Sequence, residues 1–335
     1  MKRITIYDVA KEADVSLATV SRVINDSSVV REDTRIRVQQ AIEKLGYKPN
    51  AIAQGLALSK TTTISIVMSE KLFGYNGKIL NGLMDVAKIY NYNIMFHTTS
   101  RGITRMQDVI ESIIKTRTDG VILFNDNFSE DELEVLQEYQ IPMVVVGSKI
   151  GDTKLENVGN TYVDFEKMAY DLVNSYFEKG VEDITLLEDR LNASMLAELK
   201  KGVDKAFAER GKVFTQYVPY DESFKSSYVF LTEHFKKHAP SKLVIASRDS
   251  QAYAVLNACQ EAGYKIPEDI ELVCVNNNKY LTMTKPHISA YNIPEYDIGA
   301  VSMRLLTKML VHDPSIKDNI SIEMGYSFIP RGTTK

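Results

Sequence analysis

Arg22 and the polar residues around it have side chains that suit contacts with DNA. An arginine can donate two hydrogen bonds to O6 and N7 of guanine in the major groove, and this pair of bonds identifies the base. Thr19, Ser21 and Asn25 suit contacts with phosphates, which position a protein on the duplex without reading its sequence. These side chains can act together only if one element presents them on a single exposed face.

A helix over residues 17–24 is the element that would present them. Its apolar residues Val20, Val23 and Ile24 are expected to face inward, which leaves the opposite face exposed. Ser16 precedes this helix and can cap its first turn. The exposed face is predicted to carry Leu17, Ala18, Thr19, Ser21 and Arg22.

Two more helices are predicted to support that face. Thr5 and Asp8 have the spacing of a capping box, with Asp in place of Glu, before apolar residues at 6, 9, 10 and 13. A tight turn around Asp14 then joins two short helices into a helix-turn-helix. A third helix is predicted over 32–45, with Gly46 as its stop. Spacing alone leaves a generic three-helix bundle with a solvated polar face as the alternative.

The segment that follows, YKPNAIAQGLALSKTTT over residues 47–63, indicates a hinge. Pro49 and Asn50 end the third helix, and Asn50 can cap a short, nearly uncharged helix over 51–58. A helix of this length is marginal in water, so it should order only on contact with something. Leu56 entering a base step from the minor groove would supply that contact. The alternative is a simple interdomain linker.

Charge is distributed unevenly along the 335 residues, whose formal net charge is −4. The first 60 residues carry 10 Lys and Arg against 7 Asp and Glu, a net +3, and the rest carries 30 against 37, a net −7. A small basic module on an acidic body is consistent with a nucleic-acid partner. Helix N-termini capped by Thr5 and Ser16 would add backbone donors for phosphate.

From residue 61 onward, short apolar runs alternate with helical stretches, which predicts parallel sheets flanked by helices. The first set of strands is predicted at 64–68, 93–96, 120–124 and 142–146, with helices at 78–90, 104–115 and 130–139. The second set of strands is predicted at 183–187, 242–246 and 270–275, with helices at 165–179, 194–210, 223–237 and 250–262. The pattern predicts two doubly wound α/β lobes.

Such lobes are common in enzymes, but the sequence offers no catalytic constellation. It contains no G-x-G-x-x-G after a strand, no Walker A motif, no G-x-S-x-G and no H-E-x-x-H. His234 and His238 have a metal-ligand spacing, yet Lys236 and Lys237 lie between them, so a solvated helix face is favoured over a metal site. We therefore expect neither an enzyme nor a cofactor nor a metal.

The location of the protein is predicted from what the chain lacks. No apolar run approaches the ~20 residues needed to cross a bilayer, and the N-terminus has no signal-peptide pattern. Cys259 and Cys274 lie in apolar runs and are predicted to be reduced core thiols. We expect a cytoplasmic protein without a membrane partner.

The stretches IYDVAKEADVSLATVSRVIN and YKPNAIAQGLALSKTTT resemble the DNA-binding headpiece and hinge of the lactose-repressor/galactose-repressor family. The resemblance covers essentially the whole chain and is greatest to the branch that acts in catabolite control in Gram-positive bacteria. It implies that Leu17, Ala18 and Arg22 read bases while Thr19 and Asn25 support the docking.

The resemblance also implies that the hinge inserts Leu56, with Ala53 beside it, into the minor groove at a central CG step. Asp14 stands where the family usually has Gly or Asn, and it tolerates the same backbone; Gln54 replaces an Arg of the catabolite-control branch. The predicted DNA-binding residues are Thr5, Tyr7, Ser16, Leu17, Ala18, Thr19, Ser21, Arg22, Asn25, Tyr47, Asn50, Ala53 and Leu56.

The family fold implies an all-α helix-turn-helix headpiece over 1–48, a hinge helix over 49–60 and a two-lobed α/β core over 61–335. The core would resemble periplasmic sugar-binding proteins, with crossovers near residues 160, 290 and 322 that return a helix at 295–310 to the N-terminal lobe. The N-lobe would then contain about 61–160 and 291–322, and the C-lobe about 161–290 and 323–335.

In this family the cleft between the lobes usually binds a sugar or purine through an Arg and an Asp. Leu196 and Asn276 stand at the positions that align with those residues, and only Asp249 keeps its acidic type. The loss of both charged anchors argues against a conventional sugar site, although Asp249, Asn276 and Asn277 could bind another polar molecule.

Residues 296–308 resemble the segment with which the catabolite-control branch binds the serine-phosphorylated phosphocarrier protein HPr. On a helix, Ala300, Arg304 and Lys308 share one edge, where two cations could meet a phosphoserine. The alternative is that the apolar half of this helix is core and the cations are solvated. The predicted corepressor-binding residues are Tyr296, Asp297, Ala300, Val301, Arg304 and Lys308.

These predictions favour a homodimeric transcription regulator that binds a palindromic operator and is controlled through the relation of its lobes. Serine-phosphorylated HPr is the preferred corepressor. A repressor that responds to a sugar or sugar phosphate is the alternative within the same class. A solute-binding module whose N-terminal helices bind another protein is the alternative from a different class.

Overall fold

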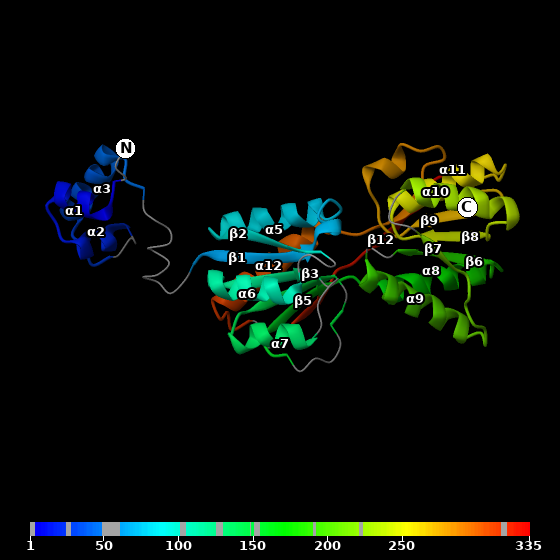
Figure 1. Cartoon of the computed structure of the whole chain (residues 1–335), viewed down its shortest axis with the longest axis horizontal. Coiled ribbons are helices and arrows are strands. Elements are labelled where there is room, and N and C mark those ends of the chain that lie inside the picture. Colours follow the sequence, from blue (N-terminus) through cyan, green and yellow to red (C-terminus); the bar gives the residue numbers. More distant parts are fainter. Residues whose placement is uncertain are drawn as a thin grey trace. The chain divides into compact units, whose positions relative to one another are not determined.

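The computed structural model describes residues 4–24, 28–48, 61–100, 105–124, 130–147, 149–150, 155–189, 192–220, 224–315 and 320–335. Contacts divide the chain into two compact units, residues 1–62 and 63–335. Each unit is described by itself (Figure 1). No helix among the described residues is long and apolar enough to span a membrane.

The first unit packs three helices around a small core: α1 (Ile6–Ala13), α2 (Leu17–Ile24) and α3 (Glu32–Leu45). One fully buried valine from each helix lies at the centre of that core, namely Val9, Val20 and Val38. Gly46, with φ +61°, ends α3 in the left-handed conformation that favours glycine. The three helices have the ranges that the apolar spacing predicts, whereas the predicted hinge helix lies outside the described residues.

The second unit contains two six-stranded sheets within the described residues. The first sheet has the order β11 (Ser321–Glu323), β5 (Val158–Tyr162), β4 (Met143–Gly147), β3 (Gly120–Phe124), β1 (Thr63–Ser69), β2 (Asn93–Thr99). The second has the order β12 (Ser327–Ile329), β10 (Ser289–Asn292), β9 (Glu271–Cys274), β8 (Leu243–Ala246), β6 (Ile184–Asp189), β7 (Tyr217–Tyr220). Apart from β12, which is antiparallel to β10, the strand pairs are parallel.

Helices cover both faces of each sheet, so the unit has two lobes (Figure 1). The first lobe contains the first sheet with α5 (Gly77–Ile89), α6 (Met106–Thr116), α7 (Glu130–Glu138) and α12 (Glu295–Leu310). The second lobe contains the second sheet with α8 (Phe165–Glu178), α9 (Ala193–Ala208), α10 (Phe224–Lys237) and α11 (Asp249–Glu261). This confirms the predicted pair of doubly wound lobes.

Side chains that alternate along the strands build these layers. On β1, Ile64 and Ile66 are fully buried in the cluster that includes α5 and α12, while Val67 packs with α6 and α7 on the opposite face. Successive side chains of a strand point to opposite faces, so a strand covered on both sides is mostly apolar along its length. This is why the central strands read as continuous apolar runs in the sequence.

The chain crosses between the lobes three times: between β5 and α8, between β10 and α12, and between β11 and β12. The second crossing places α12 against α5 and against β3, β4 and β5 of the first lobe. The lobes are therefore joined at three chain segments, the kind of connection about which lobes can rotate.

Five strands, β5, β7, β10, β11 and β12, have no counterpart among the predicted strands. β5 is fully buried but carries polar residues: Asn160 donates to the Val145 carbonyl at 3.1 Å, and Thr161 shares a hydrogen bond with Ser302 at 2.6 Å. β11 and β12 have three residues each. Polar or very short strands of this kind lack the apolar run on which the prediction depends.

Candidate functional site

The exposed face of α2 is held by the caps and turn around it. The backbone N–H of Thr5 donates to the Asp8 carboxylate at 2.8 Å, which starts α1. Asp14 ends α1 with φ 51° and donates its N–H to the Ala10 carbonyl. A carboxylic side chain is among the few besides glycine that adopt this left-handed conformation readily. Asp14 therefore makes the turn that sets α2 against α1.

Ser16 starts α2 as predicted, because its hydroxyl accepts a hydrogen bond from the Thr19 N–H at 3.2 Å. The Ser16 and Thr19 hydroxyls also lie 2.9 Å apart and share a hydrogen bond. Val20 and Val23 are buried, so the other side of the helix faces solvent. Leu17, Ala18 and Arg22 are exposed on it, and Thr19 and Ser21 are partly exposed.

The remaining predicted DNA-binding residues fall in four places. Thr5 is exposed, but its hydroxyl donates to Asp8 at 2.7 Å and so belongs to the cap of α1. Tyr7 is 68% exposed. Tyr47 is partly buried against the core of the unit. The residues that lie outside the described part of the chain are Asn25, Asn50, Ala53, Gln54 and Leu56.

The predicted partner surface lies on α12. Tyr296, Asp297 and Arg304 are exposed, and Ala300, Val301 and Lys308 are partly exposed. Ile298 and Leu305 are buried in the first lobe, so the apolar half of the helix is core while the cationic edge faces solvent. Within the described part of the chain, neither Arg304 nor Lys308 has a carboxylate within 4 Å.

The start of α12 is fixed to α5 by close contacts. The Tyr296 hydroxyl donates to the Asp85 carboxylate at 2.9 Å, and this bond raises the pKa of Tyr296. A Cβ added to Gly299 would lie 1.9 Å from the Ile79 carbonyl oxygen, and one added to Gly82 would lie 2.0 Å from the Tyr296 carbonyl oxygen. Only glycine permits this approach of the two backbones. The helices therefore form one rigid pair.

A cavity of about 120 Å³ lies between the two lobes. Its walls are mostly apolar, with Phe124 and Ile298 from the first lobe and Phe165 and Met195 from the second. Of the predicted cleft residues, Asn276 lines the cavity, whereas Asp249 and Asn277 do not. Leu196 is partly buried against the main core.

Asp249 and Asn277 are used in contacts within the second lobe. Asp249 accepts a hydrogen bond from the Asn278 side chain at 2.6 Å. Asn277 donates to the Asn292 side chain at 3.2 Å and accepts from Arg331 at 2.8 Å. Both residues therefore hold the end of β9 in place.

Glu295 and Arg248 also line the cavity, and the sequence did not identify them as cleft residues. Glu295 accepts a hydrogen bond from Asn276 of the second lobe and forms an ion pair with Lys78 of the first. The Arg248 guanidinium lies 5.3 Å from the centroid of the Tyr75 ring. Glu295 is the first residue of α12, where the helix dipole favours an acidic side chain, whereas Arg248 directly precedes α11, where the dipole disfavours a cation. Their contacts across the cleft depend on long-range folding, so no local signal marks them.

The other groups considered for chemistry have structural surroundings. His234 lies on α10 and His238 directly follows it, with their ring centroids 4.8 Å apart. The described residues contain no group of three or more potential metal ligands. Cys259 and Cys274 are buried, and burial raises the pKa of each thiol to about 12. Such thiols are protonated and poorly reactive at neutral pH.

Two known family models match parts of this chain. The family model described as bacterial regulatory proteins, lacI family, matches residues 5–50. The model described as periplasmic binding protein-like domain matches residues 173–334. The first match contains the three helices of the first unit, and the second contains most of the second lobe together with α12.

Comparison with individual proteins extends the likeness to the whole chain. It is 31% identical over 334 residues to catabolite control protein A of Staphylococcus epidermidis, covering 99% of each chain. It is 33% identical over 314 residues to catabolite control protein A of Priestia megaterium, covering 92% of each. The crystal structure of the Lac repressor dimer bound to operator and the anti-inducer ONPF matches with a TM-score of 0.86 at 21% identity, covering 99% of each chain. At that identity the structural match shows the fold.

Proposed function

The chain belongs to the lacI family of bacterial regulatory proteins, and from this premise we propose that it binds a palindromic operator as a homodimer in carbon catabolite control. It is a DNA-binding transcription regulator similar to catabolite control protein A, and proteins of this family are regulators rather than enzymes. The observation that carries the proposal is the solvent-exposed face of α2, which presents Arg22 beside Leu17 and Ala18 on a rigid three-helix unit. Such a protein acts in the cytoplasm, where the DNA is.

The exposed face of α2 reads the bases. A recognition helix in the major groove places short side chains close to the bases and lets a longer one reach a base edge. Ala18 is short enough for close approach, and Arg22 lies one turn further along the helix, where it can form the bidentate contact with guanine. Thr19 and Ser21 contact phosphates. The hinge, with Leu56 and Ala53, enters the minor groove between the two half-sites and bends the DNA.

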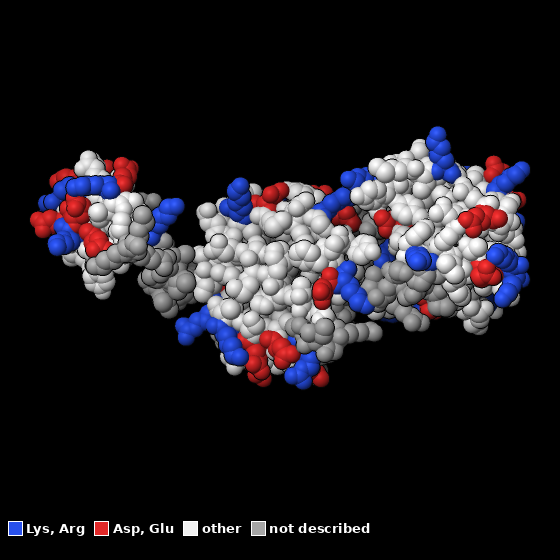
Figure 2. Space-filling view, turned by 45° about the horizontal axis from the view of Figure 1, so that its top comes forward, with Lys and Arg blue, Asp and Glu red and all other residues white. Residues whose placement is uncertain are grey.

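Exposed apolar residues on one side of the first lobe support a homodimer. Phe73, Met84, Ile89, Met95 and Phe96 are 37–72% exposed on or beside α5 and β2. β2 is an edge strand of the first sheet, and the face of this lobe that Figure 2 shows is broadly free of charged side chains. An apolar surface next to an edge strand is typical of an interface. A second copy of the chain is the partner that a palindromic site requires.

Serine-phosphorylated HPr is the corepressor that the edge of α12 fits. Arg304 and Lys308 are about 6 Å apart along the helix axis and face the same side. The body of the chain carries a net negative charge, so two neighbouring cations that have no carboxylate within 4 Å among the described residues offer a place for an anionic partner. A phosphoserine with a charge of about −1.5 to −2 would form charge-assisted hydrogen bonds with both. The exposed Tyr296 and Asp297 and the partly exposed Ala300 and Val301 would contact the protein around it.

Titration calorimetry tests this assignment of the partner. We expect heat of binding with serine-phosphorylated HPr and none with unphosphorylated HPr. The double substitution Arg304→Ala/Lys308→Ala should weaken the affinity roughly tenfold or more. The matched control, Lys236→Ala/Lys237→Ala on α10, should leave it unchanged. Absence of binding to the phosphorylated protein, or equal affinity in both double variants, would overturn the assignment.

A second candidate is a repressor that responds to a small metabolite, such as a sugar or sugar phosphate. The cavity of about 120 Å³ between the lobes favours it, because a ligand there would contact both lobes. Titration of the same protein with sugar phosphates separates the two candidates. Heat with a sugar phosphate and none with phosphorylated HPr would select the second.

A further inference from the structure

Glu295 occupies the junction of the two lobes. It is the first residue of α12, directly after the crossing from β10, and its side chain is only 13% exposed. It also lines the cavity between the lobes. A carboxylate with so little access to water must be held by hydrogen bonds or by an opposite charge.

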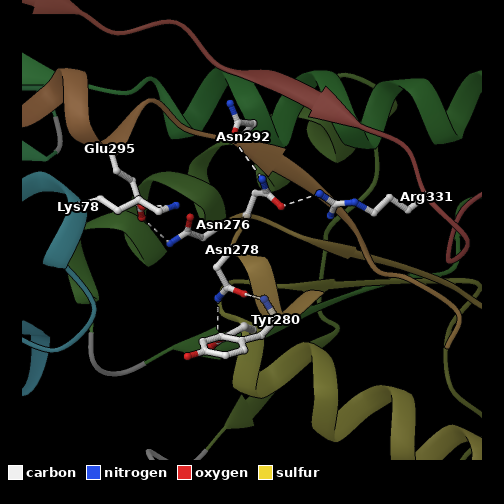
Figure 3. Close-up of polar contacts among 9 residues, drawn as sticks. Lys78, Asn276, Asn278, Tyr280, Asn292, Glu295 and Arg331 are labelled. Carbon is white, nitrogen blue, oxygen red and sulfur yellow. Dashed lines mark hydrogen bonds and ion pairs between the residues drawn. The ribbon is translucent and has the colours of Figure 1, made fainter. Parts of the chain in front are cut away.

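Each oxygen of this carboxylate is held from a different side (Figure 3). The Asn276 side-chain N–H, at the end of β9 in the second lobe, donates to Oε1 at 3.2 Å. The Lys78 ammonium, on α5 of the first lobe, lies 3.2 Å from Oε2. The bridge Asn276–Glu295–Lys78, which we call the interlobe latch, therefore spans both lobes.

The rigid pairing of α5 and α12 decides which of these contacts breaks when the lobes rotate. Gly82 and Gly299 bring the two backbones into direct contact, and Tyr296 is bonded to Asp85. Glu295 and Lys78 consequently move together with the first lobe. The hydrogen bond from Asn276 is the part of the latch that crosses to the second lobe, so a rotation that moves Asn276 away from Glu295 breaks it.

We infer that the interlobe latch replaces a bound effector in the cleft: side chains of the protein itself join the lobes and fix their relative orientation. Glu295 supplies the carboxylate, and the side chain at 276 supplies its partner. The contact of Arg248 with Tyr75 joins the same two lobes at another point of the cavity wall.

The position of Glu295 also connects the relative orientation of the lobes to the partner surface on α12. Tyr296 and Asp297 follow it directly and are exposed, so the helical turn that carries the latch also carries the start of the proposed docking site. Glu295 is thus a positioning residue for that site. This step rests on the proposed function, whereas the latch itself can be measured without DNA or HPr.

An exchange of functional groups tests the latch with little change in packing. Asn276→Asp has nearly the same shape and puts a second carboxylate against Glu295, so the like charges should separate the lobes. Asn276→Asp/Glu295→Gln restores an amide and a carboxylate with their roles exchanged, so the bond should form again. Glu295→Gln alone sets two amides side by side and serves as the single-site control.

The distance between the lobes is measured by double electron–electron resonance between spin labels on cysteines introduced at Lys115 and Lys237, both exposed and in different lobes. The native cysteines are buried and stay unlabelled. Labelled protein is mixed with an excess of unlabelled chain, so that only pairs within one chain contribute.

We expect a longer or broader distance distribution for Asn276→Asp than for the unsubstituted chain, and a return to the original distribution in the double variant. Thermal unfolding identifies any variant that is merely misfolded. An unchanged distribution in folded Asn276→Asp, or a double variant that stays as open as the single one, would overturn the inference. Either result would leave the proposed binding of DNA untouched.

Discussion

At the scale of single residues, the contacts of a side chain decide what it is free to do. Arg22 is exposed on α2, whereas Thr5 and Ser16, chosen from the sequence for the same surface, are occupied in capping α1 and α2. A capping side chain orients the helix and leaves its remaining N-terminal N–H groups to meet phosphate. The proposed DNA-binding face therefore combines residues that we expect to read bases with residues that position the helix.

Arg22→Ala separates base reading from phosphate contact. A bidentate contact with guanine is worth about 1–3 kcal/mol, so the substitution should weaken binding to the preferred operator by that amount and relax the preference at one base pair. Affinity for random DNA should change little. Fluorescence anisotropy on both DNAs measures the effect, with Arg37→Ala on α3 as a control. Equal losses on the two DNAs would show that Arg22 contacts only phosphate.

The contacts between residues in the cleft were the least predictable part of the site. The sequence identified Asn276 as a departure from the family pattern, and the structure places it on the cavity wall. It could not identify Glu295 or Lys78 as partners, because they are far apart along the chain and meet only when α12 returns to the first lobe. Contacts made through such a crossing leave no local pattern in the sequence.

At the scale of elements, one close helix pair stabilises each lobe. Gly82 and Gly299 let α5 and α12 approach until backbone atoms touch, and Gly202 of α9 does the same against the Glu166 carbonyl of α8. These pairs make the largest helix–helix contacts of the second unit, one in each lobe. The proposed docking site on α12 depends on the first pair, because that pair fixes the direction of the helix.

Gly299→Ala should destabilise the first lobe. The added Cβ would lie 1.9 Å from the Ile79 carbonyl oxygen, so the helices must separate at a cost of about 1–3 kcal/mol or more. Gly77→Ala, at the start of α5, is the matched control, since its Cβ would meet no atom within 4 Å. Thermal unfolding should show a lower midpoint for Gly299→Ala only. Equal midpoints would mean that the contact between the helices is loose.

Elements were predicted well where the apolar pattern is continuous or periodic. The ranges of α2 and α3 follow from the spacing of Val20, Val23, Val38 and Ala41 and from the stop at Gly46. The strands that escaped prediction are short or polar: β12 has three residues, and β7 contains Pro219. Short or polar strands are stabilised by neighbours distant in sequence, and apolar periodicity does not report those neighbours.

At the scale of the whole molecule, the chain combines a small basic unit with a larger acidic one. A homodimer doubles the basic unit, so phosphate binding increases without any further positive charge on the body. The acidic body limits binding to nonspecific DNA. For the second unit to control DNA binding, a change in the relative orientation of its lobes must affect the hinge between the two units. A partner can act on α12, because this helix carries both the latch and the cationic edge.

Selection from random-sequence DNA with the full chain tests the central claim most directly. A dimer with one α2 helix in each major groove should enrich a palindrome whose half-sites are centred about 10 base pairs apart, or a multiple of that spacing. The same selection with Arg22→Ala should lose the preference at one position in each half-site. Enrichment of such a palindrome is the result we predict; recovery of DNA without any common sequence would contradict the assignment of this protein as a sequence-specific regulator.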